Sequence, residues 1–183
     1  MKEKIKFNVI LDLDQTLISG EELKTFDMKK QHEKMKKFDY EIMDTDYIIF
    51  ARPHLQEFLD YLFDNFRVAV WTAASKDYAM FIVKKFILTN PKRKLNFIFY
   101  SEHCDMSKKL KNGLKSLSML WDVFQLKNYN EENTFIIDDN PEVVKNQKKN
   151  VLQIKPFFYE SRGSYQDNEL IKIQLAMEKT KQP

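Results

Sequence analysis

The chain of 183 residues contains little cysteine, glycine or proline, and this scarcity argues against several classes of protein. Its one cysteine, Cys104, excludes a disulfide within the chain, as is typical of proteins from a reducing compartment. Only three glycines and five prolines argue against a disordered or repetitive chain. No apolar run approaches the ~20 residues of a membrane-spanning helix, and the N-terminal stretch does not have the pattern of a signal peptide. We therefore expect a soluble, intracellular protein without a membrane partner, in the nucleus or the cytoplasm.

The charge of the chain is also nearly balanced. Thirty basic residues face 27 acidic ones, which leaves a formal net charge of +3. Lysines gather at residues 29–37, 84–94 and 108–115, and such clusters can contact nucleic acid. A module that binds polyanions usually has a larger excess of positive charge, so we favour a solvated lysine-rich surface. Nucleic acid remains open as a partner.

Apolar segments of two kinds alternate along the chain. A hydrophobic content of 43%, with 15 phenylalanines, is sufficient for a packed core. Short apolar runs predict core strands, and stripes with helical periodicity predict helices between them. The predicted strands lie at residues 7–11, 67–71, 95–100, 134–137 and 151–154, and the predicted helices start at Arg52-Pro53 and cover 76–88 and 169–179. This alternation predicts an α/β fold, with a mainly parallel sheet and helices on both faces.

Two segments interrupt this alternation. After the first predicted strand, residues 21–37 are charged with a weak apolar stripe, which predicts a partly helical excursion. Residues 40–43 and 47–50 follow as two short predicted strands joined by a turn. Residues 101–112 are polar and basic, and Cys104 within them is predicted to be a small buried residue rather than a metal ligand.

The first predicted strand runs directly into Asp12 and Asp14, followed by Thr16. Two carboxylates at the end of a buried strand repel each other and lose hydration, and a divalent cation or a shared proton would offset that cost. The alternative is that both aspartates cap a helix that begins near Thr16.

Later predicted strands end in comparable residues, namely Thr72 after one and Asp138 with Asp139 after another. Ligands of open α/β sheets collect at the carboxyl ends of the strands, so these side chains are expected to meet Asp12. Lys115, at the head of a later predicted helix, can join them. Thr72 could instead cap a helix, Lys115 could be a surface lysine and Asp139 a turn residue.

This constellation suits phosphoryl transfer, which needs positioning and neutralisation of charge. Asp12 can act as the nucleophile, giving an aspartyl-phosphate, while Asp14 donates and later accepts a proton. Mg²⁺ prefers oxygen ligands, which Asp12, Asp138 and a backbone carbonyl near Asp14 can supply.

The remaining residues have supporting roles in this hypothesis. The Thr72 hydroxyl and nearby backbone N–H groups, such as that of Ala73, can hold a phosphate oxygen. Lys115 can neutralise the phosphate together with Asp12, and Asp139 can orient metal-bound water or Lys115.

With these residues in place, the sequence resembles the haloacid dehalogenase (HAD) superfamily and, within it, the RNA polymerase II C-terminal-domain phosphatases, also called NLI-interacting-factor-like. The segment DLDQTL at residues 12–17 matches the Asp-x-Asp-x-Thr signature of that family. Further similar segments are RPHLQEFL at 52–59, WTA at 71–73, LKSL at 114–117, IDDNP at 137–141 and KPF at 155–157.

The resemblance implies a single HAD-like, Rossmann-like domain over residues 1–183, with insertions at about 20–50 and 97–113. It implies a Mg²⁺-dependent phosphatase of phosphoserine or phosphothreonine in proteins, with the RNA polymerase II C-terminal domain as one candidate substrate. It assigns Asp12 and Asp14 to catalysis, and Asp12, Asp14 and Asp138 to the metal. Thr72, Ala73 and Lys115 are assigned to the substrate phosphate.

Some features depart from that family. Asp139 stands where the small polymerase-tail phosphatases have asparagine, and residues 97–114 contain nothing that matches a proline pocket. Two alternative functions therefore stay open. One is a phosphatase of nucleic-acid termini or nucleotides, and the other is an inactive module that binds phosphopeptides. Retention of both Asp12 and Asp14 speaks against the second.

Overall fold

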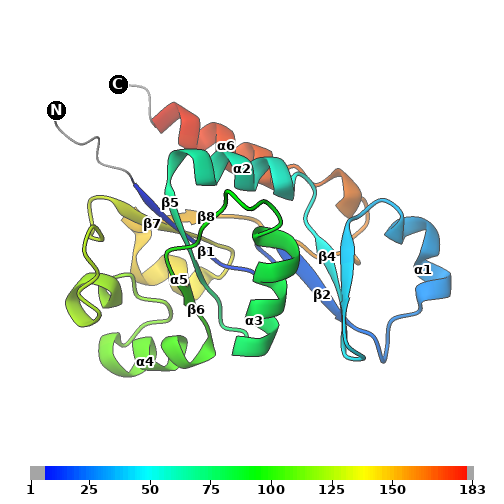
Figure 1. The fold of residues 1–183 in the computed structure, drawn as a ribbon, viewed down its shortest axis with the longest axis horizontal. Coiled ribbons are helices and arrows are strands. Elements are labelled where there is room, and N and C mark those ends of the chain that lie inside the picture. The colour runs from blue at the N-terminus through cyan, green and yellow to red at the C-terminus, as the bar shows by residue number, and fades with distance from the viewer. Residues whose placement is uncertain (1–6, 181–183) are drawn as a thin grey trace.

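A computed structural model describes residues 7–180, and its centre is a five-stranded parallel sheet (Figure 1). The strand order is β6-β5-β1-β7-β8, so the first strand of the chain is the middle strand of the sheet. The strands are β1 (Asn8–Leu11), β5 (Arg67–Trp71), β6 (Ile98–Phe99), β7 (Thr134–Asp138) and β8 (Val151–Gln153). The predicted α/β fold is confirmed. The predicted domain also includes residues 1–6 and 181–183, which lie outside the described residues.

Helices cover both faces of this sheet. On one face, Val9 and Leu11 pack against α2 (Leu55–Asn65), α3 (Lys76–Ile82) and α6 (Glu169–Thr180). Figure 1 shows α2 and α6 side by side over this face, where they are in contact. On the other face, Ile10 packs against residues of α4 (Ser101–Lys111), the π-helix η2 (Met119–Val123) and α5 (Pro141–Asn146). None of the helices in residues 7–180 is long and apolar enough to cross a membrane.

A second, smaller sheet follows β1. It is antiparallel, in the order β2-β4-β3, and is built from β2 (Ile18–Glu22), β3 (Tyr40–Met43) and β4 (Tyr47–Ala51), with α1 (Met28–Met35) between β2 and β3. The ring of Phe50 stacks on Tyr159 at 3.7 Å between centroids, which joins the small sheet to the C-terminal part of the chain. The predicted strand pair and the partly helical excursion are thus observed, whereas β2 was not predicted from the sequence.

Several predicted boundaries were wrong. The strand predicted at residues 95–100 forms ladder pairs only at Ile98–Phe99, because it is an edge strand held on one side by β5. The helix predicted to start at Arg52-Pro53 begins at Leu55, because His54 at its N-cap has a φ of 67° outside the helical region. The polar segment 101–112 is mostly the helix α4.

Other predicted helices are interrupted. The helix predicted at residues 76–88 starts after Ser75, whose side chain caps it, but it changes into the π-helix η1 (Val83–Ile87). Lys115 does not stand at the head of a helix; it lies in a loop with a φ of 49° before η2. Two short 3₁₀ helices complete the chain, η3 (Lys148–Asn150) and η4 (Ser164–Gln166).

Candidate active site

A cavity of about 380 Å³ opens at the carboxyl ends of the central strands. Asp12 follows β1 directly, Thr72 follows β5 and Asp138 is the last residue of β7. Because β5 and β7 flank β1 in a parallel sheet, the residues that follow these strands meet at one edge. Lys115 comes to the same cavity from the loop after α4. The residues singled out in the sequence are therefore brought together by topology.

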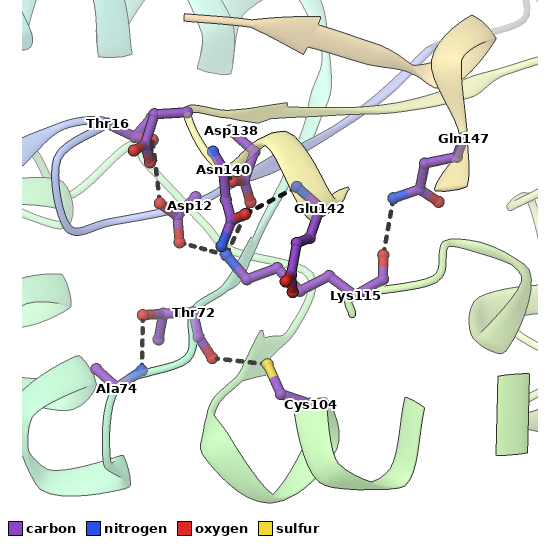
Figure 2. Close-up of polar contacts among 11 residues, drawn as sticks. Asp12, Thr16, Thr72, Ala74, Cys104, Lys115, Asp138, Asn140, Glu142 and Gln147 are labelled. Atoms are coloured by element: carbon purple, nitrogen blue, oxygen red, sulfur yellow. Dashed lines mark hydrogen bonds and ion pairs between the residues drawn. The ribbon is translucent and has the colours of Figure 1, made fainter. Parts of the chain in front are cut away.

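Lys115 bridges two of the aspartates. Its Nζ donates hydrogen bonds to Asp12 Oδ1 and, at 2.8 Å, to Asp138 Oδ2 (Figure 2). The three residues are almost completely buried, with exposed fractions of 3% for Lys115, 6% for Asp12 and 0% for Asp138. Burial is the largest single effect on Lys115 and lowers its pKa. The charges and hydrogen bonds of Asp12 and Asp138 together outweigh it and raise the pKa, so the ammonium stays charged. In this arrangement the Oδ1 of Asp12 is held against the buried ammonium of Lys115.

Thr16 contacts the other oxygen of Asp12. The Thr16 Oγ1 lies 3.0 Å from Asp12 Oδ2 and 3.2 Å from Asp139 Oδ1, so it links the carboxylates that follow β1 and β7. The sequence analysis gave Thr16 no role of its own. Its position four residues after Asp12 in the DLDQTL segment was the available signal.

Three carboxylates lie close together in the cavity. One oxygen from each of Asp12, Asp138 and Asp139 lies within 4.8 Å of the others. Burial and the charge of Asp12 raise the pKa of both Asp138 and Asp139. Hard oxygen donors at this density are suited to a divalent cation. The Asp14 carboxylate, by contrast, lies outside this group.

Asp14 points to a different partner. Tyr78 Oη in α3 donates a hydrogen bond of 2.9 Å to Asp14 Oδ1. Burial, followed by the charge of Asp12, raises the pKa of Asp14 to about 6, although the bond from Tyr78 acts in the opposite direction. A carboxyl group with such a pKa can hold a proton near neutral pH. Sequence reasoning missed Tyr78, because its helical stripe gives no sign that it meets a residue 64 positions earlier.

Thr72 begins the turn that leads from β5 into α3. Its Oγ1 accepts a hydrogen bond of 3.1 Å from Ala74 N, which leaves its hydroxyl hydrogen available (Figure 2). Among the described residues, no acceptor takes the N–H of Ala73, which lines the cavity. The Cys104 Sγ contacts Thr72 O at 3.4 Å, and Cys104 is buried, as predicted. The turn thus offers two donors towards the cavity.

The loop of Lys115 is fixed by its neighbours. Gln147 Nε2 donates to Lys115 O at 2.9 Å, and Gln147 Oε1 accepts from Leu117 N at 2.8 Å. Ser107 Oγ donates to Gly113 O at 2.6 Å and accepts from Ser116 N at 2.8 Å. These bonds hold a backbone with positive φ at a residue other than glycine, a conformation that persists only where the surroundings enforce it.

The family model for the NLI interacting factor-like phosphatases matches residues 7–183, nearly the whole chain. The chain belongs to this family. The similarity to that family described from the sequence is thereby confirmed, and the family is one of phosphatases.

Relatives of this chain occur in viruses and in vertebrates. The CTD phosphatase-like protein 355R of Invertebrate iridescent virus 6 is 45% identical over 171 residues, covering 91% of this chain and 94% of the viral protein. The ubiquitin-like domain-containing CTD phosphatase 1 of Danio rerio is 28% identical over 148 residues, covering 72% of this chain and 46% of that protein.

The fold is also found among solved structures. Fission yeast Fcp1, an RNA polymerase II CTD phosphatase whose variant was solved with beryllium fluoride, matches with a TM-score of 0.60 at 16% identity. The match covers 97% of this chain and 52% of the Fcp1 chain, so this chain spans about half of that structure. At this identity the likeness shows the fold, which is the mainly parallel HAD-like sheet expected from the sequence.

The Arg52-Pro53 segment of the family pattern lies away from the cavity. The Arg52 side chain donates to Asp167 with two nitrogens, at 2.8 and 3.0 Å, and to the carbonyls of Thr16 and Lys155 at 2.9 and 2.8 Å. Its guanidinium lies 5.4 Å from the ring centroid of Phe157, in the KPF segment. In this family member, Arg52 therefore joins the loop after Asp14 to the C-terminal part of the chain.

The lysine clusters do not gather in the cavity. Residues 29–37 lie mainly on α1, residues 84–94 on η1 and the loop after it, and residues 108–115 on the end of α4 and the following loop. Of the lysines in the part of the chain that the structure describes, only Lys115 lines the cavity at Asp12.

Proposed function

We propose that the chain is a Mg²⁺-dependent protein phosphatase that removes phosphate from serine or threonine through an aspartyl-phosphate on Asp12. The observation that carries the proposal is the placement of the Asp12 carboxylate. It stands between a buried ammonium and two further carboxylates, at the mouth of a cavity with phosphate-binding donors. This placement is expected of a nucleophile that attacks an anionic phosphate. The repulsion between carboxylate and phosphate, and the negative charge on the phosphoryl oxygens in the transition state, must both be offset.

The first step needs an attacking carboxylate and an acid. An oxygen of Asp12 forms a bond to phosphorus while the bond from phosphorus to the substrate oxygen breaks. Asp14 donates its proton to that departing oxygen, and its pKa of about 6 means that a usable fraction carries the proton near neutral pH. In the second step Asp14 takes a proton from the water that attacks the aspartyl-phosphate, which releases inorganic phosphate and restores both residues.

The transferred phosphoryl group carries charge that the site must hold. The hydroxyl of Thr72 and the N–H of Ala73 face the cavity from the turn after β5. Lys115 donates to Asp12 Oδ1, whereas Thr16 donates to Asp12 Oδ2. The Lys115 ammonium can also contact an oxygen of the phosphate that Asp12 attacks. These groups are fixed before substrate binds, which is the source of their electrostatic effect.

The residues present fit a magnesium ion. Four carboxylates, those of Asp12, Asp14, Asp138 and Asp139, line the cavity with one ammonium, so three negative charges would remain if all were ionised. Asp12, Asp138 and the backbone carbonyl of Asp14 would hold the ion, with Asp139 as a supporting carboxylate. When bound, Mg²⁺ would offset two of these charges and attract the incoming phosphate.

A protein substrate is favoured over a nucleic acid. A nucleic-acid phosphatase would be expected to lead the phosphate backbone to Asp12 along a basic groove, but Lys115 is the one lysine that lines this cavity among the described residues. Several relatives are described as CTD phosphatases or as similar to them. We therefore propose a phosphoserine or phosphothreonine protein, with the RNA polymerase II C-terminal domain as one candidate.

The test is a parallel measurement of phosphate release from two substrates. One is a phosphoserine heptad peptide of the polymerase tail and the other is an oligonucleotide with a terminal phosphate, each assayed with Mg²⁺ and with a chelator. We expect Mg²⁺-dependent release that is faster from the peptide and absent with Asp12→Asn. Faster release from the oligonucleotide would replace the protein substrate by a nucleic-acid end, and equal rates with Asp12→Asn would refute the aspartyl-phosphate.

A further inference from the structure

The contact between Tyr78 and Asp14 has an unusual setting. Tyr78 is half-buried in α3, and its phenol reaches Asp14 Oδ1 at 2.9 Å from a position where α3 meets the small sheet. The ring of Tyr47, from the first residue of β4, packs edge-on against the ring of Tyr78 at 5.4 Å between centroids. The phenol is thus held by its surroundings, and its oxygen is directed at the residue proposed as the acid.

Gly20 in β2 makes room for this phenol. A β-carbon at residue 20 would lie 2.4 Å from Tyr78 Oη, far inside contact distance. Any other residue at this position would therefore displace the hydroxyl or the strand. Tyr78, Tyr47 and Gly20 belong to three different elements, so the position of the hydroxyl is set by the way the small sheet meets α3.

The hydrogen bond distinguishes the two oxygens of Asp14. Oδ1 accepts from Tyr78, whereas Oδ2 accepts no hydrogen bond from the side chain of any other described residue. A proton carried by Asp14 is favoured on Oδ2, because Oδ1 already accepts a donated hydrogen. The same bond restricts rotation of the carboxyl group, so that Oδ2 keeps one direction.

We infer that Tyr78 is a positioning residue, which orients the carboxyl group of Asp14 so that the proton on Oδ2 reaches the departing oxygen of the substrate. The inference rests on the proposed function, in which Asp14 is the acid. Its consequence depends on the leaving group. Serine leaves as a strongly basic alkoxide that needs the proton, while p-nitrophenolate is a weak base that leaves without it.

The experiment compares kcat/KM for a phosphoserine peptide and for p-nitrophenyl phosphate, because this ratio reports the steps up to departure of the leaving group. The first variant is Tyr78→Phe, which keeps the ring and removes the hydroxyl. The second is Gly20→Ala, whose added methyl group would crowd the Tyr78 hydroxyl. Tyr47→Phe is the matched control. It removes a phenolic oxygen from the same ring pair, and that oxygen has no hydrogen-bond partner among the described residues. Asp14→Asn sets the benchmark for complete loss of the acid.

For Tyr78→Phe and Gly20→Ala we expect kcat/KM to fall about tenfold or more on the peptide and less than about twofold on p-nitrophenyl phosphate. The loss on the peptide is then a part of the ~100- to ~10,000-fold that acid catalysis typically contributes. Tyr47→Phe should change neither rate by more than about twofold. Equal losses on the two substrates, or no loss with Tyr78→Phe, would overturn the positioning role. If the unmodified chain hydrolyses neither substrate, or if Asp14→Asn shows no dependence on the leaving group, the proposed function itself fails, and the inference with it.

Discussion

Arg52 and Lys115 are both buried cations paired with carboxylates, and they differ in how completely their hydrogen-bonding groups and charges are matched. Arg52 is 1% exposed and Lys115 is 3% exposed. The guanidinium of Arg52 has five N–H groups and makes five hydrogen bonds, two with Asp167 and three with carbonyl oxygens. Lys115 instead faces more carboxylates than it can neutralise, with Asp12 and Asp138 in contact and Asp14 and Asp139 in the same cavity.

The difference separates a structural ion pair from the ion pair of the proposed active site. Around Arg52, each donor has an acceptor, and nothing is left to bind a ligand. Around Lys115, the unbalanced negative charge favours binding of a cation. Burial, followed by the charge of Asp12, raises the pKa values of Asp14, Asp138 and Asp139. Burial of charge is therefore a sign of function in this fold only where hydrogen bonds and charges do not balance.

The largest effect should come from the reactive side. Asp12→Asn removes the proposed nucleophile, and we expect kcat for any phosphomonoester substrate to fall at least ~1,000-fold. The thermal unfolding temperature should stay the same or rise, because one of four crowded carboxylates has lost its charge. Kinetics and calorimetry on the same sample check both statements. A strongly destabilised Asp12→Asn would mean that this ion pair is structural, like that of Arg52.

The second effect should come from the structural side. Arg52→Leu removes the donor to Asp167 and to three carbonyl oxygens, and we expect the free energy of unfolding to fall by about 3 kcal/mol. Arg52→Lys should recover only part of this, because an ammonium cannot make the paired contacts of a guanidinium. Urea denaturation followed by tryptophan fluorescence measures the change. Loss of activity in a fully folded Arg52→Leu chain would show that the Arg52 ion pair is not purely structural.

A third effect depends on pH. The pKa of Asp14 is about 6 in the folded chain, above the usual value of 3.8, so folding favours the protonated carboxyl group. The stability that this protonated group contributes is lost as the pH rises from about 4 to about 6. In the presence of a chelator, Asp14→Asn should therefore unfold with a free energy about 1–3 kcal/mol higher than the unmodified chain at pH 8. At pH 4 the two should be nearly equal. A difference that does not change with pH would show that the charge of Asp14 is not the cause.

The smallest effect concerns the support of Lys115. Gln147→Ala removes the two hydrogen bonds that hold Lys115 O and Leu117 N, and we expect a loss of about 1 kcal/mol in stability. Because the ammonium is then less well placed, kcat/KM should fall by about threefold to tenfold. Gln147→Glu, which keeps an acceptor for Leu117 N, is the control and should lose less stability. An unchanged kcat/KM would show that Asp12 and Asp138 suffice to place Lys115.

The sequence predicted the parts of the site that follow strands. Asp12, Thr72 and Asp138 each come directly after or at the end of an apolar run, and parallel strands bring their ends to one edge of the sheet. Thr16, Tyr78 and Gln147 were not given roles, because each acts through a contact that only the folded chain creates. The Tyr78 contact, for example, spans 64 residues of sequence.

The same reason explains the misplaced elements. β2 has the sequence ISGEE, which contains no alternation typical of a strand, and its conformation comes from pairing with β4. Lys115 was predicted at the head of a helix, yet Gln147 and Ser107 hold this backbone in a loop. Local pattern is overridden in both cases by bonds to distant residues.

The central position of β1 has a consequence for synthesis of the protein. β1 (Asn8–Leu11) leaves the ribosome before its neighbours in the sheet, since β5 and β7 begin only at Arg67 and Thr134. Until then both edges of an apolar strand, and the aspartates that follow it, lack their native surroundings. The nascent chain is therefore expected to need protection from aggregation during most of its translation, and to gain activity only once residues beyond Asp139 have been added.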